Sequence, residues 1–301
     1  MENKIIRIIK DKGPLTGSEL IDQMNEDALN VLRACRISKA LAVRIIGTRY
    51  MRLDRKIEGF ARLSPSILRE FLTYSVIGLS TDREAMERKA AELQTHIEQI
   101  SRDKLGLANN IISALVGRMA DGQYVKEHAC FIIAGDIVFN MAHDVPRPER
   151  STHKMVHGSD IDIVVVTGNR FPEMLIKRLD EEIYQEKCRL LLTPYMKEEI
   201  DYIIKDLNKA MEQMTFDTFK RMVACKIMHE GVFLYGSEEI FLRVKAMLKE
   251  NGVIEKINVM EGEARQFRER AEGYLLKEDP AKIRKEGLDF FYPAEESEEF
   301  E

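Results

Sequence analysis

Two aspartates, Asp160 and Asp162, have the side-chain type and spacing to bind a metal ion. They begin the segment 160–166, Asp-Ile-Asp-Ile-Val-Val-Val, which is typical of a buried strand. Residues two apart in a strand point to the same face, so we expect both carboxylates to project together. Neighbouring carboxylates repel each other unless a cation lies between them, and Mg²⁺ prefers oxygen ligands. The pair therefore predicts metal-dependent phosphoryl chemistry, and the alternative is a plain turn with Asp162 on a solvated face.

The elements that would position this pair alternate between strands and helices. Apolar spacing and turn residues predict strand 130–134, a turn at Gly135, helix 136–143, a polar loop, strand 160–166, helix 172–192 and strand 199–204 with Asp201. Helix 216–230 and the apolar run 232–236 follow. This alternation predicts an α/β or α+β catalytic body over residues 123–240, and the family resemblance described below implies the α+β class, with a mixed sheet flanked by helices.

The N-terminal residues 1–78 form a basic segment in an acidic chain. They carry 14 Lys and Arg against 9 Asp and Glu, whereas the whole chain has a net charge of −5. Apolar spacing predicts three short helices, the third running from about residue 25 toward Ile45 with a break near Ser38, and then a strand over 48–53. Three helices followed by a basic ribbon resemble a winged helix-turn-helix domain.

That resemblance implies contacts with DNA or RNA. The arginines on the third helix and the ribbon would contact phosphates or bases: Arg33, Arg36, Arg49 and Arg52. The alternative is a small helical domain whose basic residues form a solvated face or contact the acidic remainder of the chain.

Further regions are predicted on either side of the catalytic body. Residues 79–122 are typical of a helical linker, in which the charged helix 82–102 is also compatible with a homodimer contact. Residues 241–301 are predicted to be helical, with an acidic tail over 295–301. No apolar run approaches the roughly 18 residues of a membrane span and no signal sequence precedes the chain, so we expect a cytoplasmic protein without membrane contact. Its four cysteines are then expected to be free thiols.

Residues 130–236 resemble the nucleotidyltransferase superfamily that includes DNA polymerase β and kanamycin nucleotidyltransferase. The pattern is an apolar strand, the Gly135-Asp136 turn, Asp160-Ile-Asp162 on the next strand and a third carboxylate, Asp201, on a later strand. The resemblance implies that the three aspartates are catalytic and hold two Mg²⁺ ions. It also implies that Gly135, Asp136 and Ser159 lie against a bound nucleoside triphosphate, an ATP-like substrate.

The sequence departs from the family pattern at two places. Asp136 stands where the family usually has serine, and it would repel phosphate unless a metal intervenes, or else cap the following helix. The segment between Gly135 and Asp160 is also longer than usual and contains His143, Arg147, Arg150, His153, Lys154 and His157. This segment fits a cationic flap over phosphates, a polar loop, or a zinc site at His153 and His157.

The leading hypothesis from the sequence is a Mg²⁺-dependent nucleotidyltransferase that transfers a nucleoside monophosphate from an NTP to an unidentified acceptor. Its N-terminal domain would bind nucleic acid. One alternative is a non-catalytic DNA-binding regulator that retains a nucleotidyltransferase-like body. The presence of Asp136 in place of the usual serine suggests this alternative. A further alternative is a small-molecule nucleotidyltransferase, under which the basic N-terminal segment has no evident role.

Overall fold

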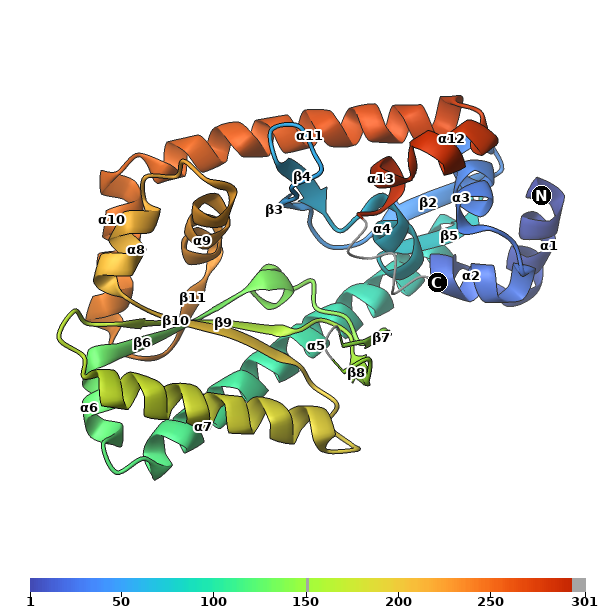
Figure 1. Ribbon diagram of the computed structural model, residues 1–301. Helices are drawn as coiled ribbons and strands as arrows, with labels where there is room; N and C mark the ends of the chain where they lie inside the picture. The colour runs from blue at the N-terminus through green and yellow to red at the C-terminus, as the bar shows by residue number, and fades with distance from the viewer. Residues whose placement is uncertain (150–151, 294–301) are drawn as a thin grey trace. The chain divides into compact units, whose positions relative to one another are not determined.

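The computed structural model describes residues 1–149 and 152–293, and the chain divides into two compact units. The terminal unit comprises residues 1–97 and the chain from 260 onward, and the central unit comprises residues 98–259. Two long helices, α5 (Arg83–Arg118) and α11 (Val253–Lys277), contribute residues to both units (Figure 1). In the described residues no helix has the length and apolarity to span a membrane.

This division differs from the boundaries that the sequence pattern suggests. Those boundaries fall at residues 78, 122 and 240, whereas the structure changes units inside α5 and inside α11. The predicted linker helix 82–102 is part of a longer continuous helix, because no residue interrupts the helical hydrogen bonding between Arg83 and Arg118. The predicted acidic tail at 295–301 lies outside the described residues.

The terminal unit surrounds a small antiparallel sheet with helices. Strands β1, β5 and β2 form that sheet in this order, and β3 pairs separately with β4. The elements of the unit are α1 (Glu2–Lys12), β1 (Leu15–Thr16), α2 (Gly17–Met24), α3 (Ala28–Ile37), β2 (Leu41–Ile45), β3 (Tyr50–Leu53), β4 (Ala61–Ser64), α4 (Ile67–Thr73), β5 (Ser75–Leu79), α12 (Pro280–Glu286) and α13 (Leu288–Phe291). Residues of α11, α12 and α13 join the same apolar core as α1 to α4.

Local sequence explains why α2 begins where it does but not where α3 ends. The Thr16 side chain accepts a hydrogen bond from the Glu19 N–H, and the Glu19 carboxylate accepts one from the Thr16 N–H, which completes a capping box. The predicted continuation of the third helix to Ile45 is wrong. Residues Leu41 to Ile45 instead pair with β5, because a neighbouring strand satisfies their backbone groups and half-buries their side chains.

The central unit contains a four-stranded mixed sheet in the order β10-β9-β6-β11. Strands β9 and β10 are parallel, and the other neighbours are antiparallel. The elements of the unit, besides the shared helices, are α6 (Gly122–His128), β6 (Ala129–Ala134), the 3₁₀ helix η1 (Gly135–Phe139), β7 (Pro146–Pro148), β8 (Met155–His157), β9 (Ile161–Thr167), α7 (Glu173–Leu192), β10 (Ile200–Asp206), α8 (Leu207–Gln213), α9 (Phe219–Glu230), β11 (Val232–Gly236) and α10 (Glu238–Glu250). The predicted α+β class is confirmed.

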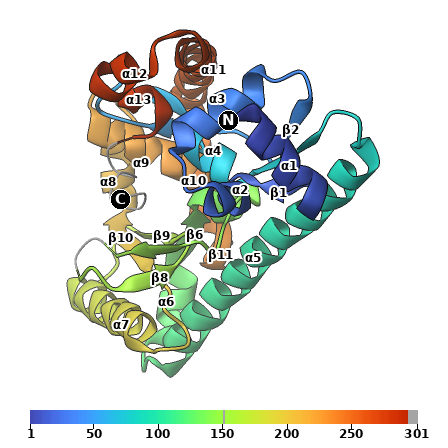
Figure 2. The same ribbon diagram turned by 90° about the vertical axis from the view of Figure 1, so that its right-hand side faces the viewer.

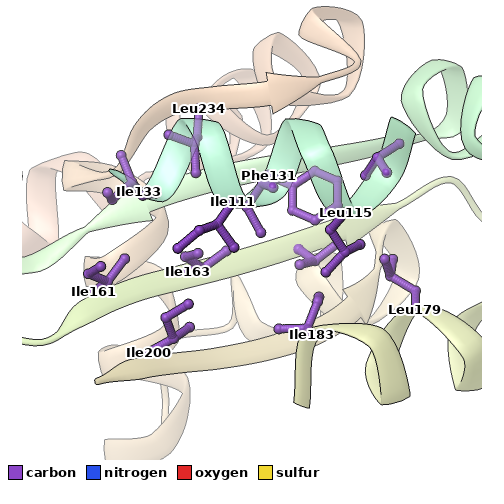
Figure 3. Close-up of a cluster of buried hydrophobic side chains, with 14 of the residues drawn as sticks. Ile111, Leu115, Phe131, Ile133, Ile161, Ile163, Leu179, Ile183, Ile200 and Leu234 are labelled. Carbon is purple, nitrogen blue, oxygen red and sulfur yellow. The ribbon is translucent and has the colours of Figure 1, made fainter. Parts of the chain in front are cut away.

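The two faces of this sheet are covered by different helices. One face packs on α5, α6 and α7, where Phe131, Ile163 and Leu115 belong to one buried apolar cluster (Figures 2 and 3). The opposite face contacts α8, α9 and α10. Asp162 and Asp201 alternate along their strands with the cluster residues Ile161, Ile163 and Ile200, and neither aspartate belongs to the cluster.

Candidate functional site

Two of the predicted carboxylates are neighbours at one end of the sheet. Asp201 of β10 is the direct cross-strand partner of Asp162 of β9, and Asp162 is in turn opposite Ala134, the last residue of β6. Side chains that are opposite each other in adjacent strands point to the same face. Asp160 directly precedes β9 and has a half-buried side chain. The three predicted aspartates therefore lie where β6 ends and where β9 and β10 begin.

The turn at Gly135 packs directly against Asp162. Gly135 has a φ of +74°, and a Cβ added there would lie 2.3 Å from Oδ2 of Asp162. Only glycine allows this approach, because it has no Cβ and tolerates positive φ. The predicted helix 136–143 is wrong, however, since η1 ends at Phe139 and the left-handed backbone of the next residue, Asn140 (φ 55°), stops the helix after five residues.

Asp136 and Ser159, both predicted to lie against the nucleotide, contact each other. The Ser159 hydroxyl donates a hydrogen bond to Oδ2 of Asp136 at 2.7 Å and accepts one from the His143 N–H at 3.2 Å. The Ser159 N–H donates to the His143 carbonyl at 3.0 Å. Asp136 does not cap the helix, as its sequence position had suggested, because η1 has no side-chain cap. These bonds instead tie the segment before β9 to η1.

Arg147 holds two carboxylates on the β9 side of the site. Its guanidinium lies 2.8 Å from Oε2 of Glu199 and 3.9 Å from Oδ2 of Asp160, and its Nε–H donates to the Gly158 carbonyl at 2.7 Å. The side chain of Arg147 is 12% exposed and that of Glu199 is 7% exposed. The predicted cationic flap therefore does contain a buried arginine, and this arginine binds carboxylates of the same unit.

Burial and neighbouring charge shift the protonation of Glu199. Burial raises the pKa of Glu199 and the Arg147 charge opposes that shift, while the negative charges of Asp160 and Asp201 raise the pKa further. The net result is a pKa above the ordinary value for glutamate. The negative charges of Asp160 and Asp201 therefore act on the Glu199 carboxylate.

Lys187 of α7 holds the third predicted carboxylate. Its Nζ donates to Oδ1 of Asp201 at 2.7 Å. Burial lowers the pKa of Lys187, but the hydrogen bond and the charges of Asp201, Glu199 and Glu149 outweigh burial and raise it overall. Lys187 therefore stays charged beside the carboxylates.

A further ion pair, between Glu230 and Lys226, lies next to the Gly135 turn. Glu230, at the end of α9, accepts a hydrogen bond from the Gly135 N–H at 3.4 Å and forms an ion pair with Lys226, one helical turn earlier. Burial raises the pKa of Glu230, Lys226 and the Gly135 N–H lower it, and Asp136 raises it again, with a net increase. A carboxylate therefore already contacts the backbone donor that the sequence assigned to a phosphate.

The donors of the site suit Mg²⁺ by chemical type but do not converge on one point. Asp160, Asp162 and Asp201 supply the carboxylate oxygens that Mg²⁺ takes, and Gly135 leaves the space that Asp162 occupies. Across residues 1–149 and 152–293, no three or more His, Cys, Asp or Glu side chains are grouped closely enough to hold an ion. The zinc site considered at the histidines is not formed among these residues either.

Several of the arginines assigned to nucleic acid contact groups inside the terminal unit. Arg33 donates to the carbonyls of Leu275 and Glu278. Arg49 makes two hydrogen bonds to the buried carboxylate of Glu70, at 2.6 and 2.8 Å, and Arg36 lies 3.8 Å from the same group. Arg52 is exposed on β3. Arg49 also lies 2.8 Å from Glu272, an acidic group of the remainder of the chain, as the alternative expected of the basic residues.

Sequence reasoning missed Glu199, Lys187 and Glu230. Glu199 could have been found, because it lies two residues before Asp201 and so repeats the spacing of Asp160 and Asp162. Glu230 and Gly135 are 95 positions apart, and no local pattern links them. Comparisons of the chain with protein-family models, curated proteins and solved structures found no match. The geometry of the site is therefore the basis for interpreting it.

Lys205, on the same face of β10 as Asp201, allows a test of how strongly this face is buried. It donates to Oε1 of Gln213 at 2.9 Å, and burial lowers its pKa from 10.5 to about 8. A lysine whose pKa is lower in the folded protein destabilises the fold at neutral pH, and this cost disappears as pH rises from about 8 toward 10.5.

We therefore expect Lys205→Met to raise the free energy of unfolding at pH 7 by about 1–3 kcal/mol. The gain should shrink as pH rises above 8. Urea unfolding of both proteins between pH 7 and 10 measures the difference, with Lys209→Met as the control because Lys209 is exposed. A gain that does not change with pH would contradict the assignment of the effect to a buried charge.

Proposed function

We propose that the central unit is a Mg²⁺-dependent nucleotidyltransferase, which transfers a nucleoside monophosphate from an NTP to an acceptor hydroxyl. The observation that carries this proposal is the cross-strand pair of Asp162 and Asp201 on one face of a mixed sheet, with the Gly135 turn against Asp162. Asp160 lies two residues before Asp162, which is the spacing of residues that share one face of a strand. These are the positions that the resemblance in the sequence assigns to catalysis.

The residues of the chain have distinct parts in this proposal. Asp160, Asp162 and Asp201 would hold the metal, which when bound supplies charge neutralisation on the phosphates and a lower pKa at the acceptor hydroxyl. Gly135 keeps Asp162 in position through their close contact. Ser159 and Asp136, through their mutual hydrogen bond, fix the segment that carries Asp160 relative to η1.

Label transfer from α-³²P-labelled NTPs tests the proposal. The four NTPs are incubated separately with MgCl₂ and with DNA, RNA or the protein itself as acceptor. We expect transfer to at least one acceptor, and a loss of at least about a hundredfold in the Asp162→Asn variant. Asp217→Asn is the matched control, because Asp217 is an exposed aspartate of the same unit that pairs with Arg221. Absence of transfer to every acceptor would count against catalysis.

One observation favours a second candidate, a non-catalytic nucleic-acid-binding regulator. The Gly135 N–H contacts Glu230, and a carboxylate at this donor disfavours a phosphate there. Under this candidate the terminal unit binds DNA or RNA through exposed basic residues such as Arg52, on a fold for which a winged helix is the proposed class.

The second candidate makes its own measurable claim. Binding of a mixed-sequence DNA duplex should weaken steeply with salt, and Arg52→Ala should lower both the affinity and the salt dependence. Asp162→Asn should leave this binding unchanged. Affinity that does not depend on salt would rule out phosphate contacts as its source.

A further inference from the structure

Two cationic side chains of the central unit contact the carboxylate cluster, which consists of Asp160, Asp162, Glu199 and Asp201. Arg147, from β7, bridges Asp160 and Glu199, and Lys187, from α7, bonds Asp201. Arg147 precedes β9 in the sequence and Lys187 lies between β9 and β10, and each contacts a different predicted metal ligand. The cluster is therefore neutralised at two points by the chain itself.

The two contacts differ in how easily they can be broken. Asp201 is 51% exposed and forms an ion pair with Lys187 at 2.7 Å, so this pair exchanges with water and salt readily. Arg147 is 12% exposed and also donates to the Gly158 carbonyl, so its removal leaves the buried Glu199 without its cation. Separation of Lys187 from Asp201 thus costs less than separation of Arg147 from Glu199.

We propose that Arg147 and Lys187 are resident counter-cations, which hold Asp160 and Asp201 until a divalent cation binds the cluster. This inference rests on the proposed metal site. Arg147 lies 3.9 Å from Asp160 and Lys187 lies 2.7 Å from Asp201, so the two aspartates contact different cations. These separate contacts account for the lack, in the described residues, of a carboxylate group close enough to hold an ion. When a divalent cation binds, Lys187 releases Asp201 and Arg147 releases Asp160, so that the two aspartates can turn toward Asp162.

Competition between the resident cations and a divalent cation can be measured directly. The test is calorimetric titration of the full chain with MnCl₂, without nucleotide, for the native protein and for Lys187→Met. We expect Lys187→Met to bind Mn²⁺ about three- to tenfold more tightly, because Asp201 loses its competing partner. Lys209→Met removes the same charge from an exposed pair in the same unit and corrects for the change in net charge.

Three further variants test the interpretation of this result. Lys187→Gln retains a donor to Asp201 without the charge, so it should also tighten binding and it guards against a folding defect in Lys187→Met. The double variant Lys187→Met/Asp201→Asn should lose the gain, because Asp201 is the group that Lys187 competes for. Arg147→Met should also tighten binding, because it removes the positive charge beside Asp160 and Glu199.

The possible results separate this inference from the proposed activity. Tighter Mn²⁺ binding in Lys187→Met than in Lys209→Met supports the inference, even if no label transfer occurs. Equal or weaker binding in Lys187→Met overturns it, even if label transfer does occur. Absence of Mn²⁺ binding in every variant also overturns it.

Discussion

Replacing Gly158 by alanine is expected to lower the free energy of unfolding by about 3 kcal/mol or more. Gly158 has a φ of +61°, and an added Cβ would lie 1.7 Å from the His143 carbonyl oxygen and 2.8 Å from the Asp144 Cα. All of these atoms belong to the backbone, so no side-chain rotation can make room. The segment at 143–144 must therefore move away from the segment that precedes β9.

That movement would break several bonds at once. Ser159 is linked to His143 by two hydrogen bonds, and the Gly158 carbonyl accepts from Arg147. Each lost bond between half-buried partners costs about 0.5–1.5 kcal/mol, in addition to the strain of a left-handed alanine. The position of Asp160, two residues later, would change with them.

Urea unfolding of Gly158→Ala and Gly168→Ala measures this effect with a matched control. Gly168 directly follows β9, and a Cβ there would meet its nearest atom, the His128 carbonyl oxygen, at 3.8 Å. The control should therefore change the free energy of unfolding by less than about 1 kcal/mol. Equal stability of the two variants would show that the backbone at 143–144 moves aside without a loss in the free energy of unfolding.

The strands of the central sheet could be predicted from the sequence because the apolar pattern of a buried strand is visible within the strand itself. Ile161, Ile163 and Val165 alternate with Asp162 at one end and continue as an apolar run, and both features are visible without any partner strand. The segment at 41–45 was misassigned because its apolar spacing fits a helix, and the pairing with β5 that makes it a strand lies more than 30 residues away.

The contacts that define the candidate site could not be predicted in the same way. Arg147 and Glu199 are 52 positions apart, and Lys187 and Asp201 are brought together by the return of α7 to the start of β10. A sequence shows that such residues are charged, but the partner of each depends on tertiary packing. The choice between a metal site and a set of ion pairs therefore depends on structure, since both use the same carboxylates.

Gly135→Ala is expected to reduce label transfer by about a hundredfold or more while leaving most of the stability intact. The added Cβ would lie 2.3 Å from Oδ2 of Asp162 and 3.3 Å from its Cγ, which are side-chain atoms that can rotate away. The cost to folding is then mainly that of a left-handed alanine, about 1–2 kcal/mol. The cost to function is larger, because the displaced carboxylate is a predicted ligand.

A double-mutant cycle distinguishes displacement of Asp162 from a general disturbance of the turn. If Gly135→Ala acts by moving Asp162, then Gly135→Ala/Asp162→Asn should be no less active than Asp162→Asn alone, and the two effects should not add. Mn²⁺ affinity should follow the same pattern. Gly106→Ala in α5 serves as the control, since a Cβ there meets no atom within 4 Å. Additive losses would show that Gly135 has a role of its own, separate from its contact with Asp162, such as the hydrogen bond from its N–H to Glu230.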